Sequence, residues 1–123
     1  MDPILVVDDE ADFVANYQRL LRRRGYRVVS AGSRGDGLVI VEREPLALVI
    51  TDLRLPDGDG LELVRAARRL PTPTPSIVVT GFASEASRVA ALAAGASGYL
   101  AKPFVAASFI SLVEKTLDSP KQL

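Results

Sequence analysis

Residues 47–50 form an unbroken apolar run that leads directly into Thr51 and Asp52. A run this short, apolar on both faces, is typical of a strand buried on both sides of a parallel sheet. The turn cluster 57–60 follows and favours a loop with positive φ. Asp52 is therefore predicted at the carboxyl end of a buried strand, where open α/β sheets bind ligands. An isolated acid there is equally typical of a helix cap or a solvated strand end, so the rest of the chain must decide.

Further short apolar runs alternate with segments of helical periodicity along the whole chain. Besides the strand that ends at Thr51, the apolar runs predict strands at residues 4–7, 26–31, 77–79 and 99–101. The periodic segments predict helices at residues 9–25, 33–44, 59–70, 84–95 and 109–117. Such alternation predicts an α/β fold, with a doubly wound five-stranded parallel sheet in the flavodoxin-like order 2-1-3-4-5 and five helices.

The length of 123 residues suits one domain, predicted at residues 1–118 with a C-terminal tail at 119–123. Lys and Arg together number 15, as do Asp and Glu, so the net charge of zero argues against direct nucleic-acid binding. The arginines at 22–24 suit the negative end of a helix instead. With neither leader nor membrane-length apolar run in the sequence, we expect a soluble, cytoplasmic protein without a membrane partner.

The chain contains no cysteine and no histidine. This excludes disulfides, Cys or His metal sites, and catalysis by a His base within this chain. Any phosphohistidine chemistry must therefore be supplied by a partner.

Polar residues follow four of the predicted strands at one edge of the sheet. Strand one ends at Asp8 and Asp9, and the predicted order places it beside the strand that ends at Asp52, while Thr80 and Lys102 reach the same edge. Clustered carboxylates repel one another, and a hard cation such as Mg2+ relieves that repulsion. Acids, an amine and a hydroxyl together indicate a phosphoryl site, in which the nucleophile is a carboxylate that forms an acyl phosphate.

The chain resembles the receiver domain of bacterial two-component response regulators from residue 4 to about residue 117. The resemblance rests on the segments VVDDE, VITDLRLPDGDG, IVVTG and GYLAKPF, in this order. It implies that Asp52 accepts the phosphoryl group and that Thr80 and Lys102 hold the phosphoryl oxygens. It further implies the following roles: Mg2+ ligation by Asp8, Asp9, Asp52 and the backbone carbonyl of Arg54, a switch role for Tyr99 beside Thr80, and a cis peptide bond between Lys102 and Pro103.

The same resemblance implies a sensor histidine kinase or a histidine phosphotransfer protein as the phosphoryl donor, and an output domain or partner protein downstream. The domain would phosphorylate and dephosphorylate itself without being a turnover enzyme. The side chains of Arg54 and Phe82 would flank the approach of water to the acyl phosphate. Neither accepts a proton at neutral pH, so we expect slow self-dephosphorylation.

Plainer interpretations stay open for each residue. Asp8 and Asp9 could cap a helix, Thr80 could be an ordinary strand residue, Lys102 a surface lysine, and Tyr99 plain sheet packing. A haloacid-dehalogenase-like phosphatase needs a second Asp two residues after the nucleophile, where this chain has Arg54. The competing function is an interaction module that ignores phosphorylation.

The last helix departs from the family pattern. Apolar residues 105–107 stand where a polar cap is usual, so the helix starts late at Ser108 or its first turn frays. Since the chain ends soon afterwards, a stand-alone receiver and a piece followed by an output domain both fit.

Overall fold

The computed structural model describes residues 1–118, and the predicted tail at 119–123 lies outside the described residues. Its main sheet contains five parallel strands in the order β2-β1-β3-β6-β7. These strands are β1 (Ile4–Val7), β2 (Val28–Ala31), β3 (Leu48–Thr51), β6 (Ser76–Thr80) and β7 (Gly98–Ala101). Numbered within this sheet along the chain, the order is 2-1-3-4-5, so the predicted topology is confirmed.

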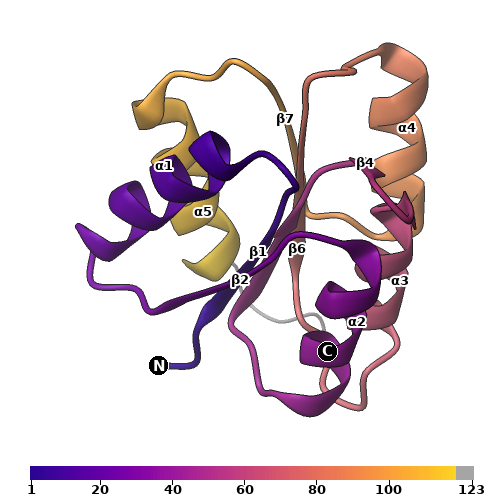
Figure 1. The fold of residues 1–123 in the computed structure, drawn as a ribbon, viewed down its shortest axis with the longest axis horizontal. Coiled ribbons are helices and arrows are strands. Elements are labelled where there is room, and N and C mark those ends of the chain that lie inside the picture. The colour runs from indigo at the N-terminus through magenta and orange to yellow at the C-terminus, as the bar shows by residue number, and fades with distance from the viewer. Residues whose placement is uncertain (119–123) are drawn as a thin grey trace.

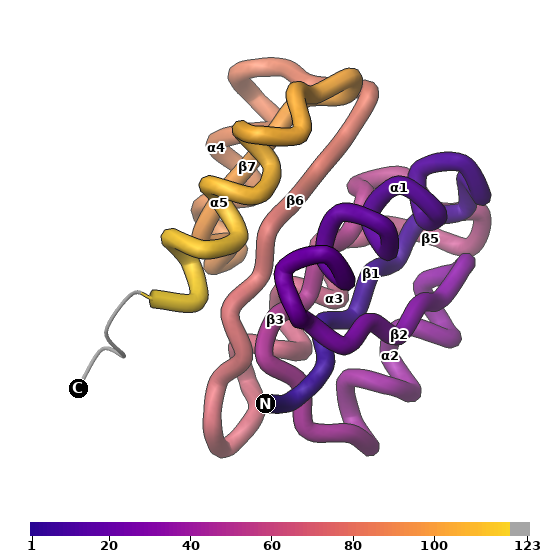
Figure 2. The backbone as a smooth tube through the Cα atoms, turned by 90° about the vertical axis from the view of Figure 1, so that its left-hand side faces the viewer, coloured from indigo at the N-terminus to yellow at the C-terminus, as the bar shows by residue number. Residues whose placement is uncertain are grey.

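Helices cover both faces of the sheet (Figure 1). They are α1 (Ala11–Arg22), α2 (Arg34–Arg43), α3 (Leu61–Arg68), α4 (Glu85–Ala94) and α5 (Ala106–Asp118). Helices α1 and α5 lie on one face, and α2, α3 and α4 lie on the other (Figures 1 and 2). None of the helices within residues 1–118 is long and apolar enough to cross a membrane.

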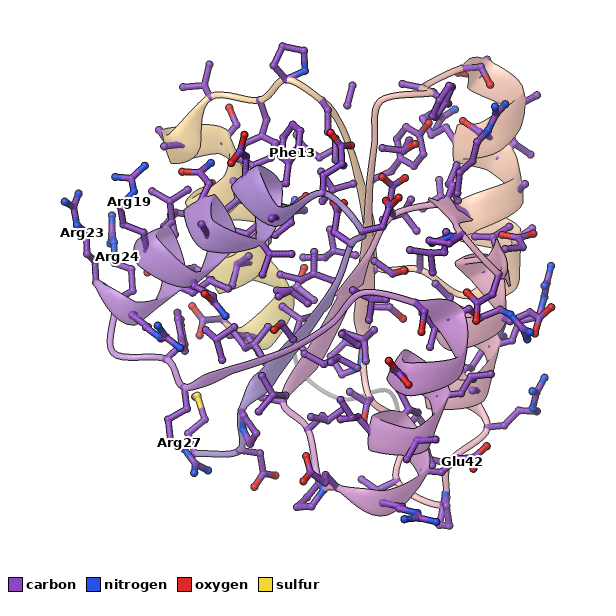
Figure 3. All side chains as sticks on the ribbon, viewed as in Figure 1. Phe13, Arg19, Arg23, Arg24, Arg27 and Glu42 are labelled. Carbon is purple, nitrogen blue, oxygen red and sulfur yellow. The ribbon has the colours of Figure 1, made fainter. Side chains whose placement is uncertain are left out.

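The three central strands β1, β3 and β6 are buried along their whole length, because helices cover them on both faces. Under α1 and α5 the core includes Tyr17, Leu21, Phe109 and Val113, packed against alternate strand residues. Burial on both faces explains why these strands have apolar runs rather than an alternating pattern. At the far end of α1, Arg19, Arg23 and Arg24 are exposed and point away from the sheet (Figure 3), as expected for a solvated face.

The connection between α1 and β2 differs from the prediction. The helix ends at Arg22 and the strand starts at Val28, whereas residues 9–25 and 26–31 were expected. The amides of Gly25 and Tyr26 donate to the carbonyls of Arg22 and Leu21, respectively. Tyr26 therefore belongs to the turn that closes the helix, and its amide is unavailable to the sheet.

Two helix ends also differ from expectation. The N-cap of α1 is Glu10, without a side-chain capping bond, so the alternative in which Asp9 caps this helix is wrong, whereas Asp8 Oδ1 accepts the amide of Glu10 at 2.9 Å. Helix α5 begins at Ala106 rather than late at Ser108. The amides of Ser108 and Phe109 donate to the carbonyl of Val105, so backbone bonds form the first turn without a polar cap.

The segment expected to be a plain loop after Asp52 contains a small antiparallel hairpin of β4 (Arg54–Leu55) and β5 (Gly58–Asp59). Its turn is attached to α2, because the Asp57 carboxylate accepts the amides of Arg34 (2.7 Å) and Gly35 (2.9 Å). These bonds lower the pKa of Asp57. At the far end of the hairpin, a Cβ on Gly60 would lie 1.8 Å from the carbonyl oxygen of Asp52, so only glycine fits there.

Candidate functional site

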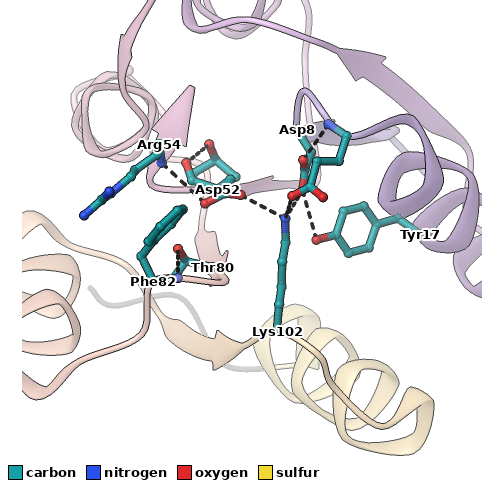
Figure 4. A network of polar contacts seen from close by, with 9 residues as sticks. Asp8, Tyr17, Asp52, Arg54, Thr80, Phe82 and Lys102 are labelled. Atoms are coloured by element: carbon teal, nitrogen blue, oxygen red, sulfur yellow. Dashed lines mark hydrogen bonds and ion pairs between the residues drawn. The ribbon is translucent and has the colours of Figure 1, made fainter. Parts of the chain in front are cut away.

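The candidate site lies at the carboxyl ends of the parallel strands (Figure 4). Asp8 follows β1 and Asp52 follows β3, and these strands are neighbours in the sheet. The Asp52 amide donates to the carbonyl of Val7, and the Lys102 amide donates to the carbonyl of Thr80. These backbone hydrogen bonds continue the sheet and therefore fix the backbone positions of Asp52 and Lys102.

Lys102 is the centre of a buried ionic cluster. Its Nζ lies 2.7 Å from Asp8 Oδ2, 2.9 Å from Asp52 Oδ2 and 3.3 Å from Glu10 Oε1. The side chains of Lys102, Asp8 and Asp52 are only 5%, 1% and 6% exposed. Water therefore screens these charges little, and each charge depends on the others.

Burial raises the pKa of Asp8, and the hydrogen bond from Lys102 only partly offsets this effect. Burial alone would lower the pKa of Lys102, but its hydrogen bonds to Asp52 and Asp8 outweigh burial and leave the pKa raised. The amine is therefore a cation at neutral pH. A site with two buried acids and one cation still has an excess of negative charge.

Two aromatic side chains of α1 contact this ionic cluster. Lys102 Nζ lies 4.0 Å from the centroid of the Phe13 ring, a favourable cation–π contact. The hydroxyl of Tyr17 is 3.4 Å from Asp8 Oδ2. In the sequence, Phe13 and Tyr17 have only the helical spacing expected of an apolar face in the helix predicted at residues 9–25. Their contacts with the acids depend on which side of α1 meets the site, which the tertiary structure decides.

Thr80 and Phe82 belong to the segment that connects β6 to α4. The buried Thr80 accepts the amide of Phe82 through Oγ1 at 3.1 Å, so its hydroxyl proton is not used in that bond. The guanidinium of Arg54 lies 3.9 Å from the centroid of the Phe82 ring, and the Arg54 amide is 3.4 Å from Asp52 Oδ1. Arg54 and Phe82, predicted to flank the approach of water to the acyl phosphate, are therefore stacked on each other (Figure 4).

Tyr99 lies on β7, half-buried against the first turn of α4. Its hydroxyl accepts the amide of Ser84 at 3.3 Å and contacts Oγ of Ser87. Ser84 is the N-cap of α4 and forms a capping box with Ser87. The hydroxyl of Tyr99 thus extends the cap of the helix that follows Thr80. The peptide bond between Lys102 and Pro103 is cis.

Three carboxylates could hold a metal ion. One oxygen each of Asp8, Glu10 and Asp52 lies within 4.8 Å of the others. Hard carboxylate oxygens are the donors that Mg2+ and Ca2+ prefer, and the excess negative charge described above favours a divalent cation, so the residues fit. Glu10 is not among the ligands predicted from the sequence, although it completes the acidic run after β1. Asp9 is not a member of this group, and its ligation and that of the Arg54 carbonyl stay predictions.

Comparisons of the sequence with known proteins identify relatives of this chain. A family model for the response regulator receiver domain matches residues 4–114. The photosynthetic apparatus regulatory protein RegA of Cereibacter sphaeroides is 36% identical over 100 residues, which are 81% of this chain and 54% of that protein. The transcriptional regulatory protein PrrA of Mycobacterium tuberculosis is 38% identical over 115 residues, which are 93% of this chain and 49% of that protein. The chain thus spans about half the length of these relatives.

Solved structures match the whole fold. A CheY-like receiver domain protein from Methanospirillum hungatei superimposes with a TM-score of 0.89 at 35% identity, covering 96% of this chain and 94% of that chain. A response regulator protein from Burkholderia pseudomallei, solved with a phosphorylated aspartic acid, a calcium ion and citrate, has a TM-score of 0.83 at 32% identity. That match covers all of this chain (100%) and 78% of that chain.

Proposed function

Because this chain belongs to the response regulator receiver domain family, we propose that it is a phosphorylation-controlled signalling switch with Asp52 as the phosphoryl acceptor. The observation that carries the proposal is the arrangement around Asp52. Its Oδ2 is bound to Lys102, whereas Oδ1 has only the long hydrogen bond from the Arg54 amide among the described residues. We therefore expect Oδ1 of Asp52 to act as the nucleophile.

In the proposed reaction, Oδ1 of Asp52 attacks the phosphorus of a phosphohistidine on a partner kinase or phosphotransfer protein. A phosphorus–oxygen bond forms, the phosphorus–nitrogen bond breaks, and the electron pair leaves with the imidazole, which takes up a proton. The product is an acyl phosphate on Asp52. This chain lacks histidine, so the phosphohistidine belongs to the partner.

The residues around Asp52 have distinct proposed roles. The cationic Lys102 would neutralise the charge on the transferred phosphoryl group. Thr80 has an unused hydroxyl proton that it can donate to a phosphoryl oxygen. When bound, a divalent cation such as Mg2+ would also neutralise phosphoryl charge. Its proposed ligands are Asp8, Glu10 and Asp52, with Asp9 and the Arg54 carbonyl as the further predicted ones.

The proposed signal passes from Thr80 to α4. A move of the Thr80 hydroxyl toward Asp52 disturbs its bond with the Phe82 amide, two residues before the N-cap Ser84. Tyr99 is bonded to that same cap, so it responds together with the helix. The surface formed by α4, β7 and α5 would then change its affinity for an output domain or partner protein. Exposed Val89 (53%) and Leu92 (42%) give this surface an apolar part.

In this proposal the domain acts in the cytoplasm, contacts proteins rather than nucleic acid, and is not a turnover enzyme. A test is incubation with acetyl phosphate and Mg2+, followed by intact-protein mass spectrometry. Wild type should gain one phosphoryl group and Asp52→Asn none, whereas the exposed acid-to-amide control Asp36→Asn should behave as wild type. If wild type gains no phosphoryl group, or Asp52→Asn gains as much, the proposal fails. Partner binding that is the same in Asp52→Ala and without Mg2+ would favour an interaction module that ignores phosphorylation.

A further inference from the structure

Tyr17 is a buried tyrosine whose hydroxyl faces the acidic site. The residue is 1% exposed, and its ring stacks on Phe104 and Phe109 at centroid distances of 5.9 Å and 5.3 Å. Within residues 1–118 the hydroxyl has one hydrogen-bond partner, Oδ2 of Asp8 at 3.4 Å. A buried hydroxyl is costly to leave unpaired, and a phenylalanine would fill the same space without this requirement. The hydroxyl therefore needs an explanation beyond packing.

The two oxygens of Asp8 have different partners. Oδ1 accepts the backbone amide of Glu10 at 2.9 Å. Oδ2 accepts two side-chain donors, Lys102 at 2.7 Å and Tyr17 at 3.4 Å. Because Lys102 also binds Asp52 and Glu10, a phosphoryl group or a cation at these acids would change its contacts, including the one to Asp8. Tyr17 is then the remaining side-chain donor to Oδ2.

We propose that Tyr17 is a positioning residue of the acidic site. Its hydroxyl holds the Asp8 carboxylate in the orientation that binds the cation, while the contacts of Lys102 with the acids change as the cation binds. This inference rests on the proposed function. Tyr17 suits the role because its ring is packed against three other aromatic rings, those of Phe13, Phe104 and Phe109, which fix its own orientation.

Groups that orient metal ligands typically change metal affinity by about ten- to hundredfold when they are removed. Since the hydrogen bond from Tyr17 is long, we expect an effect at or below the low end of that range. Tyr17→Phe should therefore weaken Mg2+ binding about three- to tenfold while the ring and its packing are kept.

The chain offers a matched control. Unlike the fully buried Tyr17, Tyr26 is partly buried against the core on the α1 side of the sheet, and it lies in the turn between α1 and β2. Tyr26→Phe also removes one phenolic hydroxyl group, but at a position away from the acids of the candidate metal site. Mg2+ affinity would be measured for wild type and both variants by isothermal titration calorimetry, at a temperature where circular dichroism shows all three folded.

A spectroscopic readout separates positioning from general loosening of the core. The protein has no tryptophan, so the near-ultraviolet difference spectrum upon Mg2+ addition reports on its three tyrosines. We expect a tyrosine signal in wild type and Tyr26→Phe that is largely lost in Tyr17→Phe. Equal Mg2+ affinity in wild type and Tyr17→Phe, or an undiminished difference signal in that variant, would overturn the inference and leave the proposed function intact. Failure of wild type to bind Mg2+ at all would overturn both.

Discussion

Replacement of Lys102 by methionine should strongly destabilise the metal-free protein. The lysine is 5% exposed and is the cation shared by the buried acids Asp8 and Asp52. Methionine keeps much of the apolar stem but leaves both carboxylates without their positive partner. Removal of one member of a buried ion pair typically costs about 3–5 kcal/mol, and we expect about 3 kcal/mol here because a carboxylate can bind a proton instead.

The loss is measured by urea unfolding with EDTA at pH 7, followed by circular dichroism. For a domain of this size, about 3 kcal/mol corresponds to a melting temperature lower by about 10 °C. The control is Arg65→Met, an exposed basic residue in the middle of α3, which should stay within about 0.5 kcal/mol of wild type. A loss below about 1 kcal/mol for Lys102→Met would refute the conclusion that the acids depend on this lysine.

Metal and pH should change this deficit in defined directions. Mg2+ at a hundred times its dissociation constant stabilises a protein by about 2.7 kcal/mol, and acids without their lysine should bind it more tightly, so the stability difference between Lys102→Met and wild type should shrink.

Burial raises the pKa of Asp8, which means that protonation favours the folded state as the pH falls. A protonated Asp8 has no charge that needs the lysine, so the stability difference between Lys102→Met and wild type should also shrink toward acidic pH. In wild type, the raised pKa of Lys102 gives stability that is complete below its ordinary value of 10.5 and is lost as the pH rises through the folded value. A deficit that grows on acidification would contradict the electrostatic explanation.

The remaining predictions concern the cation, the lifetime of the acyl phosphate and the hairpin. Millimolar Mg2+ should raise the melting temperature of wild type, and Asp9→Ala should reduce the rise if Asp9 is a ligand; an unchanged rise would remove Asp9 from the ligand set. The double variant Arg54→Asn, Phe82→Glu should lose its phosphoryl group faster than wild type in a mass-spectrometric time course, because each tenfold change in rate needs only about 1.4 kcal/mol of barrier. Equal or slower decay in the variant would contradict the hypothesis that the stacked pair shields Asp52 from water. Asp57→Ala should lower the melting temperature at neutral pH, since the hairpin loses its bonds to α2. The pKa of Asp57 is lowered from 3.8, so this difference should vanish as the pH falls through the folded value, and a pH-independent difference would point to packing instead.

The sequence by itself determined the layout of the chain. Alternation of short apolar runs with amphipathic segments implies a parallel sheet covered on both faces, and the handedness of the crossovers restricts its strand order. That order brings Asp8 beside Asp52 and places Thr80 and Lys102 at the same edge, as the structure shows. These features are predictable because they depend on residue type and chain order alone.

Only the tertiary structure decided which side chains make the contacts of the site. Glu10 rather than Asp9 joins Asp8 and Asp52: both acids are exposed, but only the Glu10 carboxylate reaches Lys102 Nζ and the two buried acids. Tyr17 has the helical spacing of a core residue, yet its hydroxyl reaches Asp8. Arg54 and Phe82 stack on each other although separate segments supply them. Each of these contacts depends on orientations and distances set by packing between distant segments, and periodicity and local propensity contain no such information.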